Sequence, residues 1–301
     1  MQLGAANAST VVVTACATAS STSTKQPTFF DKMHRAVFDN YLSYVDANGY
    51  GLRMHRNAPC AGSTVCHRPL AWYKLPFVVA ALKAPFVRNA FWSDCDSLFL
   101  THQPLPLELL HETQHAAFTY EPGLGPFRAS QVNSGHFLLR ANSWSIALLS
   151  AAWEVYPPPE PARWYEQSSL IFLLGGSRMQ CRAHIFREGC YDNLSGNMWS
   201  ERMAVLPPSA FNALPWELHA RPLTWVWMVH FFGDDVVYRD VLQQSKASIM
   251  LEFAQALAPS KTRQHADSSS TGQTRNRSGY PDGLIALIRR VHRNATAAAR
   301  S

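Results

Sequence analysis

Two aspartates separated by one residue are the feature of this chain whose chemistry is easiest to interpret. Asp94 and Asp96 lie between the apolar segments 86–92 and 98–100. Since successive residues of a strand point to opposite faces, the two carboxylates share one face and Cys95 points the other way. Two carboxylates leaving a buried strand together are unfavourable unless a cation lies between them. The pair therefore predicts a site for Mg²⁺ or Mn²⁺ carrying a diphosphate, or else a solvated pair at a strand end.

Alternating strand and helix patterns place this pair in the sheet of an α/β fold. We expect strands at 10–15, 51–55 and 86–92, separated by helices at 29–47 and 72–84. Elements that alternate in this way build a parallel sheet flanked by helices. Ligands of such sheets bind beyond the carboxyl ends of the strands, which is where the aspartate pair follows its strand.

The second half of the chain continues with strands and helices in a less regular order. Asn142 precedes a helical pattern and is expected to cap it. The expected elements are a strand at 133–140, helices at 143–155 and 163–174, an apolar strand at 225–232 and a final helix at 234–257.

Composition indicates a globular protein with its basic charge confined to one end. Of the 301 residues, 47% are hydrophobic and 16% are charged, which excludes a largely disordered chain. The net charge of +6 arises within 259–301, where eight Lys/Arg stand against two Asp/Glu. We therefore expect one domain over 1–258 without a nucleic-acid partner, followed by a basic tail that is disordered at 259–279 and forms a short helix at 283–293.

No segment has the composition of a membrane span or of a signal peptide. No stretch reaches the length of about 18 consecutive apolar residues that a transmembrane helix needs. The first residues have no basic region ahead of an apolar core, so they do not predict a signal peptide.

The six cysteines are too few for a disulfide scaffold, and no C-x-x-C pair predicts structural zinc. Cys60 with Cys66, and Cys181 with Cys190, are close enough in sequence to form bridges or to remain free thiols. Four Asn-x-Ser/Thr sequons, at 7, 193, 276 and 294, permit a secretory location.

Five short motifs follow one another along the chain. They are Trp72-Tyr73-Lys74-Leu75-Pro76, the W-x-D-x-D-x-L-F block at 92–99, Asn133-Ser134-Gly135 with Phe137-Leu138-Leu139-Arg140, Glu166-Gln167-Ser168 and Val229-His230-Phe231. In this order they resemble glycosyltransferase family 34 over residues 10–235. The resemblance implies a GT-A fold, a nucleotide-diphosphate sugar donor, Mn²⁺ or Mg²⁺, and a product linked in the α configuration.

The resemblance also implies roles for individual residues around a metal. Asp94 and Asp96 match the motif that holds metal and donor, with Asp96 as the direct ligand. His230 matches a late histidine that completes the site, although a histidine at a strand end can also be structural. Lys74 and Arg140 could add positive charge near the diphosphate, or could lie on a solvated helix face and in a structural ion pair.

The resemblance places further residues near the sugar. Glu166 and Gln167 match a segment beside the anomeric carbon, where a carboxylate or amide would stabilise an oxocarbenium-like state. Family members carry two aspartates before that glutamine, whereas this chain has Tyr165-Glu166, so Glu166 could instead be a solvated carboxylate favoured by the helix dipole. Asn133 and Ser134 would line the pocket.

Gly135 is expected to serve the backbone geometry of the same turn. Asn212 also fits the family pattern, or serves in a turn.

The resemblance implies a Golgi enzyme acting on an oligosaccharide or polysaccharide acceptor, as a homo- or hetero-oligomer. The donor could be UDP-xylose, UDP-galactose or GDP-mannose. Family members usually carry an N-terminal membrane anchor, which would have to belong to a segment absent from this chain.

Two alternatives from other classes remain open. A haloacid-dehalogenase-like phosphatase also places Asp-x-Asp after a strand, and Gly233-Asp234-Asp235 resembles its late acidic motif. An inactive, transferase-like module would bind glycans without needing a metal.

Overall fold

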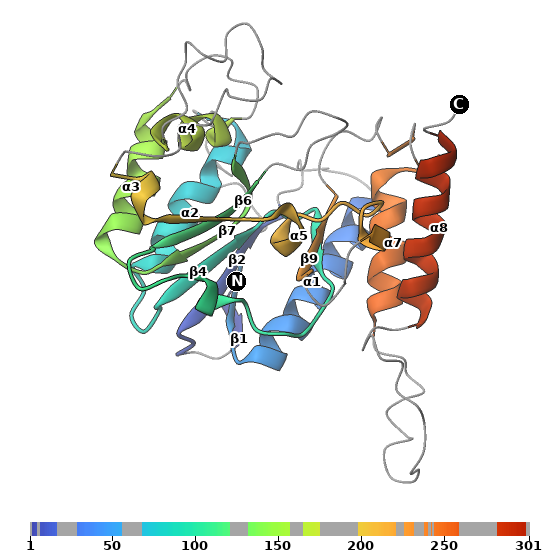
Figure 1. The fold of residues 1–301 in the computed structure, drawn as a ribbon. Helices are drawn as coiled ribbons and strands as arrows, with labels where there is room; N and C mark the ends of the chain where they lie inside the picture. The colour runs from blue at the N-terminus through green and yellow to red at the C-terminus, as the bar shows by residue number, and fades with distance from the viewer. Residues whose placement is uncertain are drawn as a thin grey trace, which may run out of the picture.

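The computed structural model has an α/β fold, with helices on both faces of a central sheet (Figure 1). The structure describes residues 2–4, 7–16, 29–55, 68–120, 132–156, 165–174, 198–220, 226–231, 238–239, 242, 244–258 and 282–298.

The central sheet has seven strands in the order β1-β3-β2-β4-β7-β6-β8. Five of them, β3, β2, β4, β6 and β8, run in one direction, and β1 and β7 run in the other. The expected α/β fold with a mixed, mostly parallel sheet is therefore confirmed. The strands are β1 (Gln2–Gly4), β2 (Thr10–Ala15), β3 (Gly51–His55), β4 (Asn89–Ser93), β6 (Ala116–Tyr120), β7 (Val132–Arg140) and β8 (Met203–Leu206).

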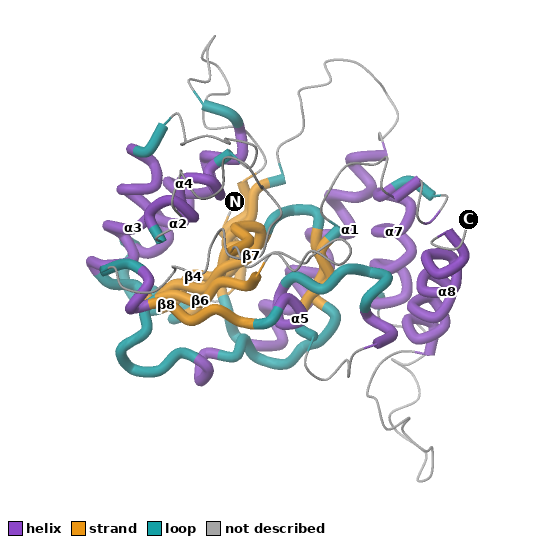
Figure 2. The backbone as a smooth tube through the Cα atoms, turned by 45° about the horizontal axis from the view of Figure 1, so that its top comes forward, coloured by secondary structure: helices purple, strands orange, loops and turns teal. Residues whose placement is uncertain are grey.

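Helices cover both faces of this sheet, so its central strands are apolar on both sides. On β2, Val11 and Val13 pack into the core under α2, α3 and α4, while Val12 packs into the core on the opposite face with α1, α7 and α8. Figure 2 shows these two groups of helices on opposite sides of the strands. The helices are α1 (Phe29–Asn48), α2 (Lys74–Leu82), α3 (Ser143–Glu154), α4 (Glu166–Leu173), α5 (Pro208–Phe211), α7 (Lys246–Leu257) and α8 (Asp282–Ala298).

A second sheet of two short strands lies beside the first. Strands β5 (Ser97–Phe99) and β9 (Met228–His230) pair antiparallel, with Ser97 opposite His230. Because β5 follows β4 after a three-residue turn, this pairing brings the end of β9 to the turn that holds both aspartates.

Most of the expected elements form, with some boundaries shifted. Asn142 caps α3 as predicted, its side chain accepting a hydrogen bond from Ser145 N at 2.9 Å. Within the final helix expected at 234–257, residues 238–239 and 242 are helical, and α7 begins separately at Lys246, where Ser245 caps it and accepts from Ser248 N. Of the strand expected at 225–232, the structure describes residues 226–231, and three of these form β9.

The expectation that everything after 258 lies outside the folded domain is wrong for α8. Leu284, Leu287, Ile288 and Val291 are buried in the same core as α7, and basic residues such as Arg289 are exposed. The predicted short helix at 283–293 is therefore longer and packed. The segment 259–279, expected to be disordered, lies outside the described residues.

The helices that the structure describes include none that is long and apolar enough to span a membrane.

Candidate active site

The two aspartates lie in the turn between β4 and β5. They follow the carboxyl end of β4, as the alternation of strands and helices predicted. Backbone hydrogen bonds hold this turn from two sides: Asp94 N donates to Gly135 O on β7, and Phe231 N, just after β9, donates to Asp96 O, both at 2.8 Å. The side chains of Asp94 and Asp96 remain 31% and 26% exposed. The pair is thus fixed by its backbone and open to solvent at its carboxylates.

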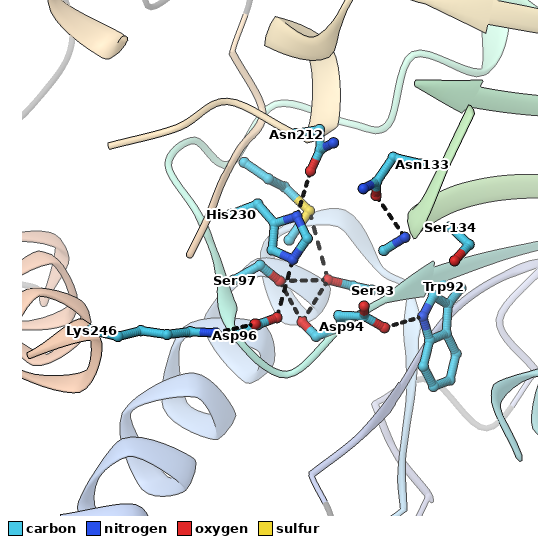
Figure 3. Close-up of polar contacts among 12 residues, drawn as sticks. Trp92, Ser93, Asp94, Asp96, Ser97, Asn133, Ser134, Asn212, His230 and Lys246 are labelled. Carbon is cyan, nitrogen blue, oxygen red and sulfur yellow. Dashed lines mark hydrogen bonds and ion pairs between the residues drawn. The ribbon is translucent and has the colours of Figure 1, made fainter. Parts of the chain in front are cut away.

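His230 joins the two aspartates in a cluster of candidate metal ligands. One ligand atom from each of Asp94, Asp96 and His230 lies within 4.8 Å of the others. The Nε2 atom of His230 is 3.1 Å from Asp96 Oδ1, and its Nδ1 atom contacts Asn212 Oδ1 (Figure 3). When Nδ1 donates its proton to Asn212, the lone pair of Nε2 faces Asp96, the arrangement of a ligand histidine fixed by a second partner.

Two carboxylate oxygens and an imidazole nitrogen suit Mn²⁺, and Mg²⁺ less well. The donor set and its spacing fit the ion that the resemblance implies. Asn212 thus has a role that goes beyond a turn, because it orients the candidate ligand His230.

Asp96 also forms an ion pair with Lys246, the first residue of α7, at 2.6 Å. Burial would raise the pKa of Asp96, but the charges of Lys246 and His230 outweigh it and hold that pKa below its usual range. Asp96 is therefore ionised. Lys246 belongs to no motif in the sequence, and only the fold brings it to a residue 150 positions away.

Asp94 is held from the other side by Lys74 and Trp92. Lys74 Nζ lies 3.0 Å from Asp94 Oδ1 and 2.7 Å from Glu166 Oε1, and Trp92 Nε1 donates to Asp94 Oδ1 at 2.7 Å. Burial alone would lower the pKa of Lys74, but the two carboxylates raise it above its ordinary value. Lys74 is thus a buried ammonium ion between two acidic groups, and it does not lie on a solvated helix face.

Glu166 and Gln167 begin α4 and face β7. Ser134 Oγ donates to Glu166 Oε1, and Ser134 N donates to Gln167 Oε1, both at 2.8 Å. Glu166 is buried, and its second oxygen has no hydrogen-bond partner among the residues that the structure describes. Burial, aided by the nearby charge of Asp94, raises the pKa of Glu166 against the opposing effect of Lys74. The interpretation of Glu166 as a solvated carboxylate is wrong.

The residue before Glu166 has an unusual backbone conformation. Tyr165 has φ of 50° and ψ of −126°, a region that non-glycine residues rarely adopt, and its side chain is exposed. Strain of this kind persists where the surrounding structure over-determines the conformation, often at functional sites. Here it accompanies the turn that directs Glu166 inward.

Gly135 brings β7 close to the candidate ligands. A Cβ atom at this position would lie 2.6 Å from His230 Cε1, 2.8 Å from Asn133 Oδ1 and 3.3 Å from Asp94 Oδ2. Asn133 Oδ1 accepts a hydrogen bond from Gly135 N at 2.7 Å. Gly135 lies within β7 rather than in the expected turn, and its lack of a side chain leaves open the space between the ligands.

Arg140 does not lie at the site. It stands at the far end of β7, about 20 Å along the strand from Ser134, and donates to Leu110 O at 2.9 Å. The expectation that it adds charge near the diphosphate is wrong, because residues six positions apart on a strand occupy opposite ends of the sheet.

A disulfide joins Cys95, the residue between the two aspartates, to Cys16. Cys95 packs against the core that contains Cys16, and it lies in a turn, where the alternation of side chains expected for a strand does not apply. This bridge was not predicted, although each of its cysteines follows the carboxyl end of an expected strand. The pairs Cys60/Cys66 and Cys181/Cys190 lie outside the described residues.

Sequence comparisons give limited but consistent similarity to glycosyltransferases. No protein-family model matches the chain. Two curated proteins called "Probable glycosyltransferase 4", from Oryza sativa subsp. indica and subsp. japonica, are 31% identical over 157 residues, which covers 43% of this chain. The match spans 31% of the length of each of these relatives.

Solved structures with a similar fold include a glycosyltransferase involved in the glycosylation of the major capsid of PBCV-1. The TM-score is 0.51 at 14% identity, over 80% of this chain and 98% of that one. The glycosyltransferase GlyE of Streptococcus pneumoniae TIGR4 matches at a TM-score of 0.42 and 12% identity, over 83% of this chain and 66% of that one.

The fold is therefore GT-A-like, and it carries a cluster of two aspartates and a histidine that could bind a metal. This fold differs from the one that the phosphatase alternative requires. The Gly233-Asp234-Asp235 segment on which that alternative relied lies outside the described residues.

Proposed function

We propose that this chain is a metal-dependent, retaining glycosyltransferase that moves a hexose or pentose from a nucleotide-diphosphate sugar to a glycan acceptor. The observation that carries this proposal is the Asp94, Asp96 and His230 cluster at the carboxyl end of β4. Similarity to glycosyltransferases in sequence and in fold supports it.

The cluster would hold Mn²⁺, which when bound offsets negative charge that develops on the leaving diphosphate. Asp96 is the stronger candidate for direct ligation because its Oδ1 atom faces His230 Nε2 at 3.1 Å. Asp94 reaches the donor or the ion from the opposite side. Asn212 keeps the His230 ring oriented, and Gly135 leaves the space that the ligands share.

Glu166 would act on the sugar. The bond from the anomeric carbon to the phosphate oxygen breaks, with its electron pair leaving on the diphosphate. The acceptor hydroxyl bonds to the same face and releases its proton to the leaving phosphate oxygen. The buried carboxylate of Glu166 stabilises the positive charge that develops on the sugar ring, and Ser134 and Lys74 fix its position. Gln167, whose Oε1 atom accepts a hydrogen bond from Ser134 N, would lie beside Glu166 near the sugar.

The finer assignments follow from the resemblance to family 34. The donors to be tested are UDP-xylose, UDP-galactose and GDP-mannose, with an oligosaccharide or polysaccharide acceptor. We further propose a Golgi lumenal location. The Cys16–Cys95 disulfide supports it, because disulfides persist in oxidising compartments.

A thermal-shift panel tests the proposal. The wild-type protein is melted with each nucleotide sugar, with Mn²⁺ or with EDTA, beside the variants Asp96→Asn and Asp46→Asn. Asp46 is an exposed residue of α1 and serves as the matched control. We expect one nucleotide sugar to stabilise wild type and Asp46→Asn only with Mn²⁺, and Asp96→Asn to lose the shift.

Absence of any Mn²⁺-dependent shift, together with no donor hydrolysis, would contradict the transferase proposal. Metal-independent stabilisation by a glycan without turnover would instead favour the inactive, glycan-binding alternative.

A further inference from the structure

The Cys16–Cys95 disulfide ties the turn between the two aspartates to the centre of the sheet. Cys16 directly follows β2, is buried, and donates its backbone N–H to His55 O at 2.9 Å. Strand β2 lies between β3 and β4 and runs parallel to both. Cys16 is therefore a rigid anchor, and the residue it holds is the one between Asp94 and Asp96.

The two aspartates are drawn toward opposite sides of the site. Asp94 is bound by Lys74 and Trp92, whereas Asp96 is bound by Lys246. Figure 3 shows Lys246 and Trp92 on opposite sides of the two carboxylates. Without a further restraint, each carboxylate could follow its own partner and the distance between them could grow.

Backbone contacts restrain the two ends of the turn, the hydroxyls of Tyr41 and Ser97 donate to Asp94 O, and the disulfide restrains the side chain of Cys95. Asp94 N and Asp96 O are bound to Gly135 and Phe231. Cys95 lies between these two contacts, and its side chain is bonded to Cys16, which is buried in the core.

We propose that the Cys16–Cys95 disulfide is a positioning element for the candidate metal ligands, so that affinity for the metal depends on the redox state of this bridge. The inference rests on the proposed function insofar as that function requires a metal at this cluster. A dithiol reductant would supply two electrons and two protons. The S–S bond would break, Cys16 and Cys95 would become thiols, and the dithiol would be oxidised to its own disulfide.

The test compares Mn²⁺ affinity with thermal stability. Affinity is measured by the EPR signal of free Mn²⁺ during titration, and stability is measured in EDTA. The samples are the oxidised wild-type protein, the double variant Cys16→Ala/Cys95→Ala, and Leu284→Ala. Leu284 is buried in α8, so its truncation lowers the melting temperature without touching the turn.

We expect the double variant to bind Mn²⁺ about 10- to 100-fold more weakly, the range found for residues that orient metal ligands. Leu284→Ala should keep the wild-type affinity despite its lower melting temperature. Wild-type protein that is reduced and then reoxidised should lose and regain affinity, which provides the same comparison if the double variant fails to fold.

Equal Mn²⁺ affinity of oxidised and reduced protein would overturn the inference and leave the proposed function standing. Failure of the oxidised wild-type protein to bind Mn²⁺ would overturn both. A parallel loss of affinity in Leu284→Ala would show that the bridge acts only through general stability, and would also overturn the inference.

Discussion

At the scale of single residues, the two aspartates of the motif have different surroundings. Asp94 shares Lys74 with Glu166, so it belongs to a buried network that also includes Ser134. Asp96 shares its oxygens between His230 and Lys246. A cation at Asp96 would compete with Lys246 for the same carboxylate, which makes Lys246 the natural counter-ion of the metal-free state.

Gly135→Ala should impair the site more than the fold. The added methyl group would lie 2.6 Å from His230 Cε1, so His230 or β7 must move. Overpacking of this kind costs about 1–3 kcal/mol, and we expect Mn²⁺ affinity to fall together with stability. Titration of Mn²⁺ and denaturant unfolding measure the two effects.

Gly283→Ala is the matched control, since a Cβ atom there meets nothing within 4 Å. It should leave Mn²⁺ affinity unchanged and stabilise α8 slightly, because alanine favours helices. Normal Mn²⁺ affinity in Gly135→Ala would contradict the close approach of β7 to the ligands.

Lys74→Met should be strongly destabilising. It removes the cation between Asp94 and Glu166 and leaves Glu166 buried without a counter-charge. Removing one partner of a buried ion pair costs about 3–5 kcal/mol. Urea unfolding of the variant, and of Lys74→Met/Glu166→Gln, measures the loss.

The double variant should recover part of that stability, because its amide carries no charge. An unchanged urea midpoint of unfolding in Lys74→Met would contradict a stabilising role for this ion pair.

At the scale of elements, the long ones could be predicted and the short ones could not. Helix α1 and strands β2 and β3 carry clear periodicity, and Asn142 marks the start of α3. Strands β5 and β9 have three residues each, so they present no periodic pattern. Their pairing places His230 at Asp96, and only tertiary structure creates that contact.

The site was predicted to the extent that its residues follow strand ends. The alternation of elements placed Asp94 and Asp96 after a strand, whereas Asn133, near the start of β7, was placed by the family motifs alone. Lys246 and the Cys16–Cys95 bridge were missed because each depends on contacts between distant segments. Arg140 was misplaced because its motif extends along the whole of β7.

Helix α8 offers a prediction about the extent of the domain. Leu284→Ala should destabilise the protein by about 2–5 kcal/mol, because Leu284 is buried against the core that contains α7. Arg289→Ala, on the exposed face of the same helix, should change stability by less than about 0.5 kcal/mol. Chemical denaturation measures both, and equal effects of the two substitutions would contradict the packing of α8.

At the scale of the whole molecule, the candidate site lies where the two sheets meet. The turn that follows β4 supplies Asp94, β7 of the large sheet supplies Ser134, and β9 of the small sheet supplies His230. Helices α4 and α7 add Glu166 and Lys246 from opposite sides (Figure 2). The fold thus brings side chains as far apart in sequence as Lys74 and Lys246 to one site. We propose that a metal and a donor sugar bind there.

The central claim is that Asp94, Asp96 and His230 form one metal site, and pulsed EPR of bound Mn²⁺ tests it most directly. We expect a nitrogen hyperfine coupling from the imidazole in wild-type protein, its loss in His230→Ala, and a large loss of Mn²⁺ affinity in Asp96→Asn. Tight Mn²⁺ binding without nitrogen coupling in the wild-type protein, or with unchanged affinity in Asp96→Asn, would contradict the account.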